Sequence, residues 1–222
     1  MNATLTIVAT PIGNLKDITE RALDTLRSVD LILCEDTRVT RNLLARYEVD
    51  IEVMSYHQHS DDKKIEEILS LLADGKDLAL VTDAGTPGIS DPGGILVDIV
   101  RRELPEVEVT AAPGVSAVIT ALSISGMPAD KFIFLGFPPL KKKRKKYFEE
   151  VAAQKHTVVF YESCHRIKKA LANLAEVLDE ESQVCICREL TKKFESVYRG
   201  TIAEVAEMDI PEKGEFVVIV NT

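Results

Sequence analysis

Three stretches of this 222-residue sequence combine glycine and proline with polar side chains, and each one follows directly on an apolar run. They lie around Pro11, Asp83 and Gly114, and the longest reads VTDAGTPGISDPGG from Val81 to Gly94. Glycine lets backbone N–H groups approach a ligand, and proline stiffens the path of the chain. The pattern predicts a backbone-lined pocket with Asp83 at the carboxyl end of its strand, where open α/β sheets bind ligands. The alternative is a plain surface connection, although such a turn needs only about 2–6 residues.

The glycine spacing limits which ligand this pocket takes. The first loop has a single glycine, Gly13, so there is no GxGxxG fingerprint, and no GxxxxGK[ST] phosphate loop occurs anywhere. Hydride transfer and phosphoryl transfer are therefore disfavoured. S-adenosylmethionine fits better, because it carries no phosphate and needs only backbone contacts and a few acceptors.

Strands and helices alternate through the first half of the chain. Apolar runs predict strands at 5–10, 31–35, 51–55, 78–82 and 107–111, with amphipathic helices between them and a further helix that buries Val118, Ile119, Ala121 and Leu122. Such alternation predicts a mostly parallel five-stranded sheet. Gly126 ends the last of these helices, so we expect an N-terminal α/β domain over 1–126.

The second domain, 127–222, has a different pattern. Strands are expected at 132–137, 157–161, 184–189, 196–201 and 216–220, with an amphipathic helix over 165–178. Three strands in the last forty residues with one short helix between them indicate antiparallel pairing. The predicted fold class is therefore α/β with two domains, the second of them mixed or antiparallel.

Charge is distributed unevenly. Lys and Arg number 27 against 36 Asp and Glu, a net charge of −9 that argues against a protein that simply coats nucleic acid. Residues 1–116 hold 11 basic and 21 acidic side chains, whereas residues 117–222 hold 16 and 15. A polyanion would prefer the second half, where Lys141–Lys146 form a basic run.

Other classes of protein find no support. No apolar run approaches the roughly 20 residues of a membrane span, and no apolar signal region opens the chain. The four cysteines lack a CxxC pair and the four histidines show no ligand spacing, so we expect no metal and reduced thiols in the cytoplasm.

Six motifs occur in one order along nearly the whole chain, and together they resemble the tetrapyrrole methylase superfamily, in its ribosomal RNA small subunit methyltransferase I branch. They are TPIGNLKDIT (10–19), CEDTR (34–38), TDAGTPGISDPG (82–93), APGVSA (112–117), FYESCHR (160–166) and CRELTKKFE (187–195). The resemblance implies a two-domain tetrapyrrole methylase-like fold, usually a homodimer, with S-adenosylmethionine in the cleft between the domains. The implied activity is 2'-O-ribose methylation of a cytidine in 16S rRNA of the small ribosomal subunit.

The resemblance implies the cofactor contacts, whereas the catalytic candidates follow from polar side chains at strand ends or in loops, and the RNA candidates from clustered positive charge. Cofactor contacts are expected at Pro11, Ile12, Asp83, Ala84, Gly85, Thr86, Val115, Ser116, Tyr161 and Leu190. Polar candidates for the catalytic step are Asp36, Arg38, Glu162, His165, Arg166 and Glu189. Candidates for RNA phosphate contact are Lys141, Lys142, Lys143, Arg144, Lys145, Lys146, Arg188 and Lys192.

Several of these candidates have structural alternatives. Asp36 has the position of a cap that begins a helix at Thr37. His165 and Arg166 stand at a helix start, where a cation is disfavoured unless an anion such as an RNA phosphate is near. His57 and His59 are either substrate contacts or surface residues. Two other functions also stay open: a methylase of porphyrin or corrin rings, and a non-catalytic module that binds S-adenosylmethionine or RNA.

Overall fold

The computed structural model describes residues 3–57, 60–91 and 93–222. The chain divides into two compact units on either side of the Ser116–Ala117 bond. Among the described residues no helix is both long and apolar enough to cross a membrane.

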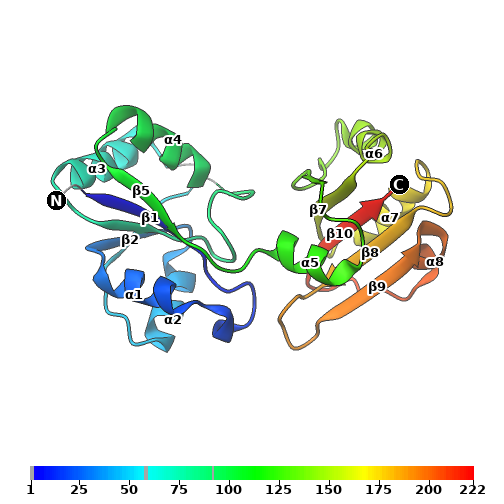
Figure 1. Ribbon diagram of the computed structural model, residues 1–222, viewed down its shortest axis with the longest axis horizontal. Coiled ribbons are helices and arrows are strands. Elements are labelled where there is room, and N and C mark those ends of the chain that lie inside the picture. The colour runs from blue at the N-terminus through cyan, green and yellow to red at the C-terminus, as the bar shows by residue number, and fades with distance from the viewer. Residues whose placement is uncertain (1–2, 58–59, 92) are drawn as a thin grey trace. The chain divides into compact units, whose positions relative to one another are not determined.

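The first unit is built on a five-stranded sheet (Figure 1). Its strands are β1 (Thr4–Val8), β2 (Leu31–Cys34), β3 (Val53–Ser55), β4 (Leu78–Leu80) and β5 (Glu108–Ala112). They lie in the order β3-β2-β4-β1-β5, and every pair is parallel. This confirms the predicted parallel five-stranded sheet.

Helices cover both faces of this sheet. A short 3-10 helix, η1 (Leu15–Asp17), precedes α1 (Glu20–Ser28) and α2 (Thr37–Arg46), which lie below the sheet in Figure 1, whereas α3 (Asp62–Ala73) and α4 (Gly93–Glu103) lie above it. Successive residues of β2 therefore face two different cores: Leu33 packs with α3 and α4, and Ile32 packs with α1 and α2. Burial on both faces explains why these strands are continuous apolar runs.

The order of the strands fixes where a ligand site can form. The connections from β1 to β2 and from β2 to β3 lead toward one edge of the sheet, and those from β3 to β4 and β4 to β5 lead toward the other. The direction reverses between the neighbours β1 and β4. Open α/β sheets bind ligands at the carboxyl ends of the strands at such a switch point, and here the loops around Pro11 and Asp83 start there.

The second unit holds a mixed five-stranded sheet. Its strands are β6 (Phe132–Phe134), β7 (Thr157–Ser163), β8 (Gln183–Arg188), β9 (Ser196–Thr201) and β10 (Glu215–Asn221), in the order β6-β7-β10-β8-β9. Only the β6–β7 pair is parallel among these described strands. The mixed and largely antiparallel sheet predicted from the last forty residues is confirmed.

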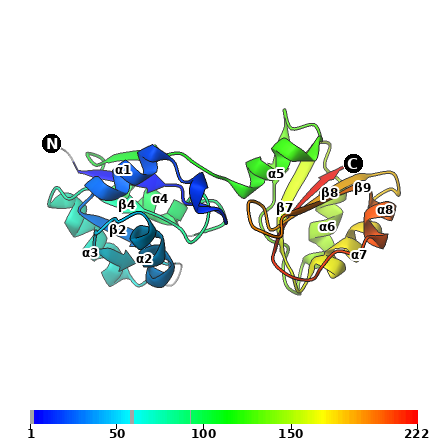
Figure 2. The ribbon, with the colours of Figure 1, turned by 90° about the horizontal axis from the view of Figure 1, so that it is seen from below.

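Four helices flank the second sheet. Figure 2 shows α6 (Arg144–Ala152), α7 (Ile167–Ala175) and α8 (Ile202–Glu207) on one side of the strands and α5 (Ala117–Ser125) on the other. Helix α5 packs on β10, so the unit begins at Ala117, whereas the sequence placed the boundary at Gly126. The expected burial of Ile119 is wrong: the residue is 55% exposed, and the residues that α5 buries are Val118, Ala121, Leu122 and Ser125.

Candidate functional site

The loops that follow β1 and β4 are joined at the switch point. Thr10 and Gly85 exchange two backbone hydrogen bonds, Thr10 N to Gly85 O at 2.9 Å and Gly85 N to Thr10 O at 3.0 Å. The Thr10 hydroxyl donates to the Thr82 carbonyl at 3.0 Å inside the same junction. The predicted cofactor residues Pro11 and Ile12 therefore follow directly on a backbone clamp, and both are buried.

The loop after β5 joins the same place. The Thr86 hydroxyl donates to the Val115 carbonyl at 3.0 Å. Gly85 has a φ of +90°, and a Cβ there would stand 3.5 Å from Ile12 Cγ2 and 3.8 Å from the Val115 oxygen. These are ordinary van der Waals distances, so it is the left-handed backbone that favours glycine at this point. The structure thus brings together Ile12, Gly85, Thr86 and Val115, four of the residues expected to contact cofactor; Ser116 follows, half-buried, and Ala84 is exposed.

Asp91 closes the long loop and is a residue that sequence reasoning missed. Its Oδ1 accepts from Gly88 N at 2.6 Å and from Gly93 N at 2.8 Å. A Cβ on Gly93 would lie 2.8 Å from Gly88 N, so this return of the chain excludes any larger residue. The signal was an aspartate two residues before a helix, where its carboxylate can accept backbone N–H groups.

Carboxylates gather at the same edge of the sheet. Burial, followed by the charges of Asp83 and Asp91, raises the pKa of Glu35, which directly follows β2. Partial burial of the carboxyl group also raises the pKa of Asp83, although the residue as a whole is exposed. A hydrogen bond from Asp36 N, at 3.2 Å from Asp83 Oδ1, and the charge of Arg38 oppose the shift. At both carboxyls burial outweighs the opposing interactions, among them the charge of Arg38 near Asp83. A cationic ligand placed among them would be stabilised.

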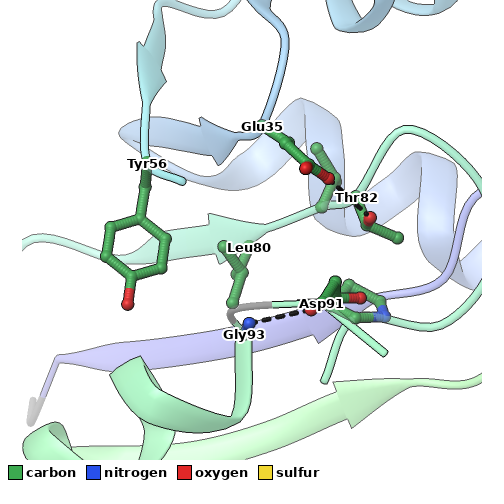
Figure 3. A pocket seen from close by; sticks show the side chains of 8 residues that line it. Glu35, Tyr56, Leu80, Thr82, Asp91 and Gly93 are labelled. Atoms are coloured by element: carbon green, nitrogen blue, oxygen red, sulfur yellow. Dashed lines mark hydrogen bonds between the residues drawn. The ribbon is translucent and has the colours of Figure 1, made fainter. Parts of the chain in front are cut away.

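Figure 3 shows how two of these carboxylates lie. Glu35 points at the Thr82 hydroxyl, 3.5 Å away, and Asp91 holds Gly93 N. The cavity between them, completed by Tyr56 and Leu80, encloses about 10 Å³. That is room for about one water molecule, so this cavity is too small for an organic ligand.

The structure gives Asp36 and Arg38 a shared local role. Asp36 is the N-cap of α2: its Oδ1 accepts from Arg38 N at 2.8 Å, and its Oδ2 accepts from Arg38 NH2 at 2.6 Å. Hydrogen bonds from the Arg38 side chain and backbone lower the pKa of Asp36 well below its usual range. The helix-capping alternative for Asp36 is confirmed, and a carboxylate held ionised in this way is a weak proton acceptor.

Glu162 lies at the centre of a buried ion triad in the second unit. Its side chain is fully buried, and its carboxylate contacts Arg144 NH2 at 3.2 Å and Arg166 Nε at 2.9 Å. Ser163 N also donates to Glu162 Oε1 at 2.8 Å. The anion that Arg166 needs at the start of α7 is therefore Glu162, not the RNA phosphate that the sequence suggested. His165, between them in the sequence, is exposed.

Arg144 differs from the rest of the basic run. Only 6% of it is exposed, and beyond Glu162 it bonds Asn173 Oδ1 at 3.0 Å. This burial removes Arg144 from the candidates for phosphate contact. The five lysines of the run are exposed: Lys141, Lys142, Lys143, Lys145 and Lys146.

The turn after β8 is strained around Leu190. Glu189 and Thr191 have φ angles of +53° and +66°, which are costly for residues other than glycine. Glu189 accepts from Lys192 Nζ and from Glu215 N, both at 3.0 Å; burial opposes the ionised form, but these bonds lower the pKa of Glu189. Leu190, which lies between Glu189 and Thr191, is buried. Backbone strain of this kind is typical of functional sites.

Two further RNA candidates are engaged within the protein. Arg188 donates to the carbonyls of Lys213 at 2.6 Å and Phe194 at 2.9 Å. Lys192 pairs with Glu189 at 3.0 Å and Glu215 at 2.7 Å. Both side chains stabilise the turn after β8, so a role in RNA contact is less supported for them than for the exposed lysines.

Tyr161, the cofactor candidate on β7, lies in an aromatic group. Its ring centroid is 4.9 Å from that of Phe134 and 5.2 Å from that of Phe137. Burial raises the pKa of its hydroxyl, so Tyr161 is neutral near pH 7.

The remaining polar candidates do not add a metal site. Within residues 3–57, 60–91 and 93–222, no three His, Cys, Asp or Glu side chains form a group that could hold a metal ion. His57 is exposed, with its backbone N bonded to Ser60 Oγ at 2.9 Å. His59 lies outside the described residues.

The first unit's junction suits S-adenosylmethionine. The backbone at Gly85 lets a ligand approach closely, and Ile12 and Val115 offer apolar contact. Glu35 and Asp83 offer negative charge to a sulfonium or ammonium group. A ligand without phosphate needs no helix N-terminus cradle. The residues present therefore fit this cofactor.

Sequence relatives give the family. The model described as Tetrapyrrole (Corrin/Porphyrin) Methylases matches residues 4–206. A protein of Vibrio cholerae named ribosomal RNA small subunit methyltransferase I is 48% identical over 98% of this chain and 76% of its own length. The Thermotoga maritima protein of the same name is 43% identical over 98% of this chain and 97% of its own length.

Solved structures share the fold at low identity. Diphthine synthase superposes with a TM-score of 0.75 at 13% identity, over 99% of this chain and 90% of that one. The methyltransferase CobJ superposes with a TM-score of 0.71 at 19% identity, over 99% and 94%. The family model and the close sequence relatives agree with this fold, and the chain belongs to the tetrapyrrole methylase family, in the group of proteins named ribosomal RNA small subunit methyltransferase I.

Proposed function

We propose that this protein is an S-adenosylmethionine-dependent methyltransferase that methylates the ribose 2'-hydroxyl of a cytidine in 16S rRNA. The observation that carries the proposal is the similarity to relatives named ribosomal RNA small subunit methyltransferase I, which are 42–48% identical over 98% of this chain in Vibrio cholerae, Escherichia coli and Bacillus subtilis. The backbone junction at Gly85 and the carboxylates beside it support the use of S-adenosylmethionine, because they suit a cationic cofactor without phosphate.

The cofactor residues of the first unit have separate tasks. Pro11, Ile12, Gly85, Thr86 and Val115 form a rigid wall, because their loops are joined by the Thr10–Gly85 and Thr86–Val115 hydrogen bonds. Ala84 and Ser116 extend this wall, and Asp83 and Glu35 attract positive charge. S-adenosylmethionine supplies an electrophilic methyl group on a positively charged sulfur.

Tyr161 and Leu190 of the second unit are expected to complete the cofactor site, and a cofactor position between the two units stays a prediction. The aromatic contacts of Tyr161 and the strained turn at Leu190 support their inclusion. Both are held firmly, as a positioning role requires.

The catalytic step needs only modest assistance from a general base. In-line attack on a charged methyl donor depends on alignment, and a base need only take the hydroxyl proton late. Asp36, Arg38, Glu162, Arg166 and Glu189 are each held in ion pairs or capping hydrogen bonds. His165 is exposed, and histidine is the side chain that most often acts as a general base, so we assign it as the first of the six to test as the base.

The second unit supports RNA contact through its exposed lysines. Lys141, Lys142, Lys143, Lys145 and Lys146 stand on one short segment before and within the first turn of α6. Exposed lysines of this density attract phosphate, and the binding free energy then depends on salt.

Methyl transfer tests the proposal directly. Tritiated S-adenosylmethionine is offered with assembled small subunits, free 16S rRNA and uroporphyrinogen, and we expect label in the RNA, on a ribose oxygen of a cytidine. Label in uroporphyrinogen alone would support a porphyrin methylase. Label in none of the three substrates would support a binding module.

His165→Gln, which keeps size and polarity, should lower kcat and leave the cofactor affinity unchanged.

The proposal carries two further expectations. Ribosomal RNA as substrate implies a cytoplasmic protein, and the resemblance implies a homodimer. Sedimentation equilibrium of the purified protein measures the second expectation, since a dimer doubles the 24.5 kDa mass of the chain.

A further inference from the structure

An exposed aromatic ring contacts Tyr161 and has no function of its own assigned so far. Phe137 is 53% exposed, and its ring centroid is 5.2 Å from that of Tyr161, at an interplanar angle of 54°. Leu140, three residues on, is 72% exposed. Large apolar side chains displayed in this way mark contact surfaces when polar or charged residues surround them. Sequence reasoning did not single out Phe137.

The segment that carries Phe137 is held in place by hydrogen bonds from the buried ion triad. Arg166 NH1 donates to the Pro138 carbonyl at 3.3 Å, and Arg144 NH1 donates to the Pro139 carbonyl at 3.4 Å. Both arginines are held by the fully buried Glu162. Two arginines that share one carboxylate thus fix the consecutive carbonyls of Pro138 and Pro139. The proline rings restrict the backbone further. The exposed ring is therefore displayed on a rigid segment.

Positive charge follows this segment at once. Lys141, Lys142 and Lys143 come directly after Leu140, and all three are exposed. They stand out in a chain with a net charge of −9. An aromatic face beside lysines is the combination with which proteins hold unpaired RNA: the bases stack on rings and the backbone phosphates contact the cations.

We infer that Phe137 is a stacking platform for an unpaired nucleobase of the RNA substrate, with the phosphates next to that base held by Lys141, Lys142 and Lys143. The inference rests on the proposed function and adds to it the form of the substrate: a nucleotide in a single-stranded segment. A base inside a duplex has both faces covered by its neighbours and cannot stack on Phe137. The ring contact with Tyr161 places the stacked base beside a proposed cofactor residue.

The chain itself offers a clean probe, because it contains no tryptophan. Phe137→Trp introduces a single indole that keeps an aromatic face, and stacking of a base on it quenches its fluorescence. The ligand is a single-stranded RNA of about ten nucleotides, with the same strand in a perfect duplex for comparison. We expect quenching that saturates with the single strand and is absent with the duplex. Phe137→Ala should weaken single-strand binding by about 5- to 150-fold.

Phe132→Trp is the matched control, since Phe132 begins β6 in the same unit and is 38% exposed. Anisotropy of labelled RNA reports binding independently of the indole. If the RNA binds and the Phe137→Trp emission does not change, or changes no more than that of Phe132→Trp, the stacking role is overturned while the proposed function stands. If neither form of RNA binds any variant or the unchanged protein, and small subunits accept no methyl group, both proposals are overturned.

Discussion

Thr10 and Gly85 exchange backbone hydrogen bonds of 2.9 and 3.0 Å, so the loops after β1 and β4 are joined where the direction of the strand connections reverses. The bridge makes the predicted cofactor loops one rigid wall instead of two independent turns. Its geometry depends on Gly85, whose φ of +90° lies in a region that L side chains rarely adopt.

Gly85→Ala should weaken cofactor binding by more than it weakens the fold. The left-handed backbone costs the variant about 1–2 kcal/mol in the free energy of unfolding, and the new methyl group stands 3.5 Å from Ile12. Gly75→Ala is the control, because Gly75 has a similar φ of +83° and nothing within 4 Å of its Cβ. We expect similar losses of stability by urea unfolding and a higher S-adenosylmethionine Kd, by calorimetry, for Gly85→Ala alone. Equal cofactor affinity in the two variants would exclude Gly85 from the site.

Asp83→Asn removes the negative charge while keeping an oxygen for Asp36 N. The fold should stay intact, because Asp83 is exposed on a loop. S-adenosylmethionine has a positively charged sulfur and its demethylated product a neutral one, so affinity for the cofactor should fall further than affinity for the product. Calorimetry with both ligands measures this difference, with Asp98→Asn on the exposed face of α4 as the control. Affinities that match those of the unchanged protein would contradict the central-loop assignment.

Cofactor binding should weaken on acidification through the titration of Glu35 and Asp83. Burial raises the pKa of both carboxyls above the values of the unfolded chain. The folded protein therefore binds their protons more tightly, and their contribution to stability falls as pH rises from the unfolded to the folded pKa. Binding of a cation has the opposite trend, since it needs both groups ionised. The S-adenosylmethionine Kd should rise as the pH falls from neutrality toward the raised pKa of these carboxyls, and it should rise less in Asp83→Asn. A pH-independent Kd would show that these groups do not face the cofactor.

The fold could be predicted from the sequence because local patterns determine most of it. Apolar runs that are covered on both faces, such as Leu31–Cys34, are typical of a parallel sheet. Ile119 shows the limit. Helix α5 is apolar nearly all round, so its sequence does not say which face β10 covers.

The site was harder to predict, because ion pairing depends on residues far apart in the chain. Arg144 stands among lysines in the sequence, yet its side chain is buried because it pairs with Glu162, 18 residues away. The sequence likewise suggested an RNA phosphate as the partner of Arg166, and the structure supplies Glu162 instead. Charge type was readable from the sequence, but the partner of each charge was not.

Glu162→Gln should destabilise the second unit strongly. The substitution leaves Arg144 and Arg166 without their shared anion, and breaking a buried pair in this way costs about 3–5 kcal/mol in the free energy of unfolding. Glu212→Gln is the matched control, because its pair with Lys168, at 2.8 Å, is exposed and contributes about 0–1 kcal/mol. Urea unfolding compares the two variants. Equal midpoints would mean that water, not Glu162, compensates the arginines.

The lysine run should set the salt dependence of RNA binding. Each phosphate contact contributes about one unit to the slope of log affinity against log salt, and slightly less on single strands. Lys142→Ala/Lys145→Ala should therefore flatten the slope by roughly one to two units. Lys142 and Lys145 are exposed, and the 3.9 Å contact of Lys145 with Glu149 is a weak surface pair, so folding should not change. Cofactor affinity should not change either, because the run lies outside every loop assigned to the cofactor.

The control for this double variant is Lys168→Ala/Lys169→Ala, which removes two exposed lysines from α7 of the same unit. Both variants change the net charge of the chain equally, so any general electrostatic effect on RNA binding is the same in each. Binding of small subunits or 16S rRNA is measured across a salt series for both variants and the unchanged protein. If the two double variants shift the slope by the same amount, the run acts only through net charge, and RNA contact has to be assigned to other cations of the second unit.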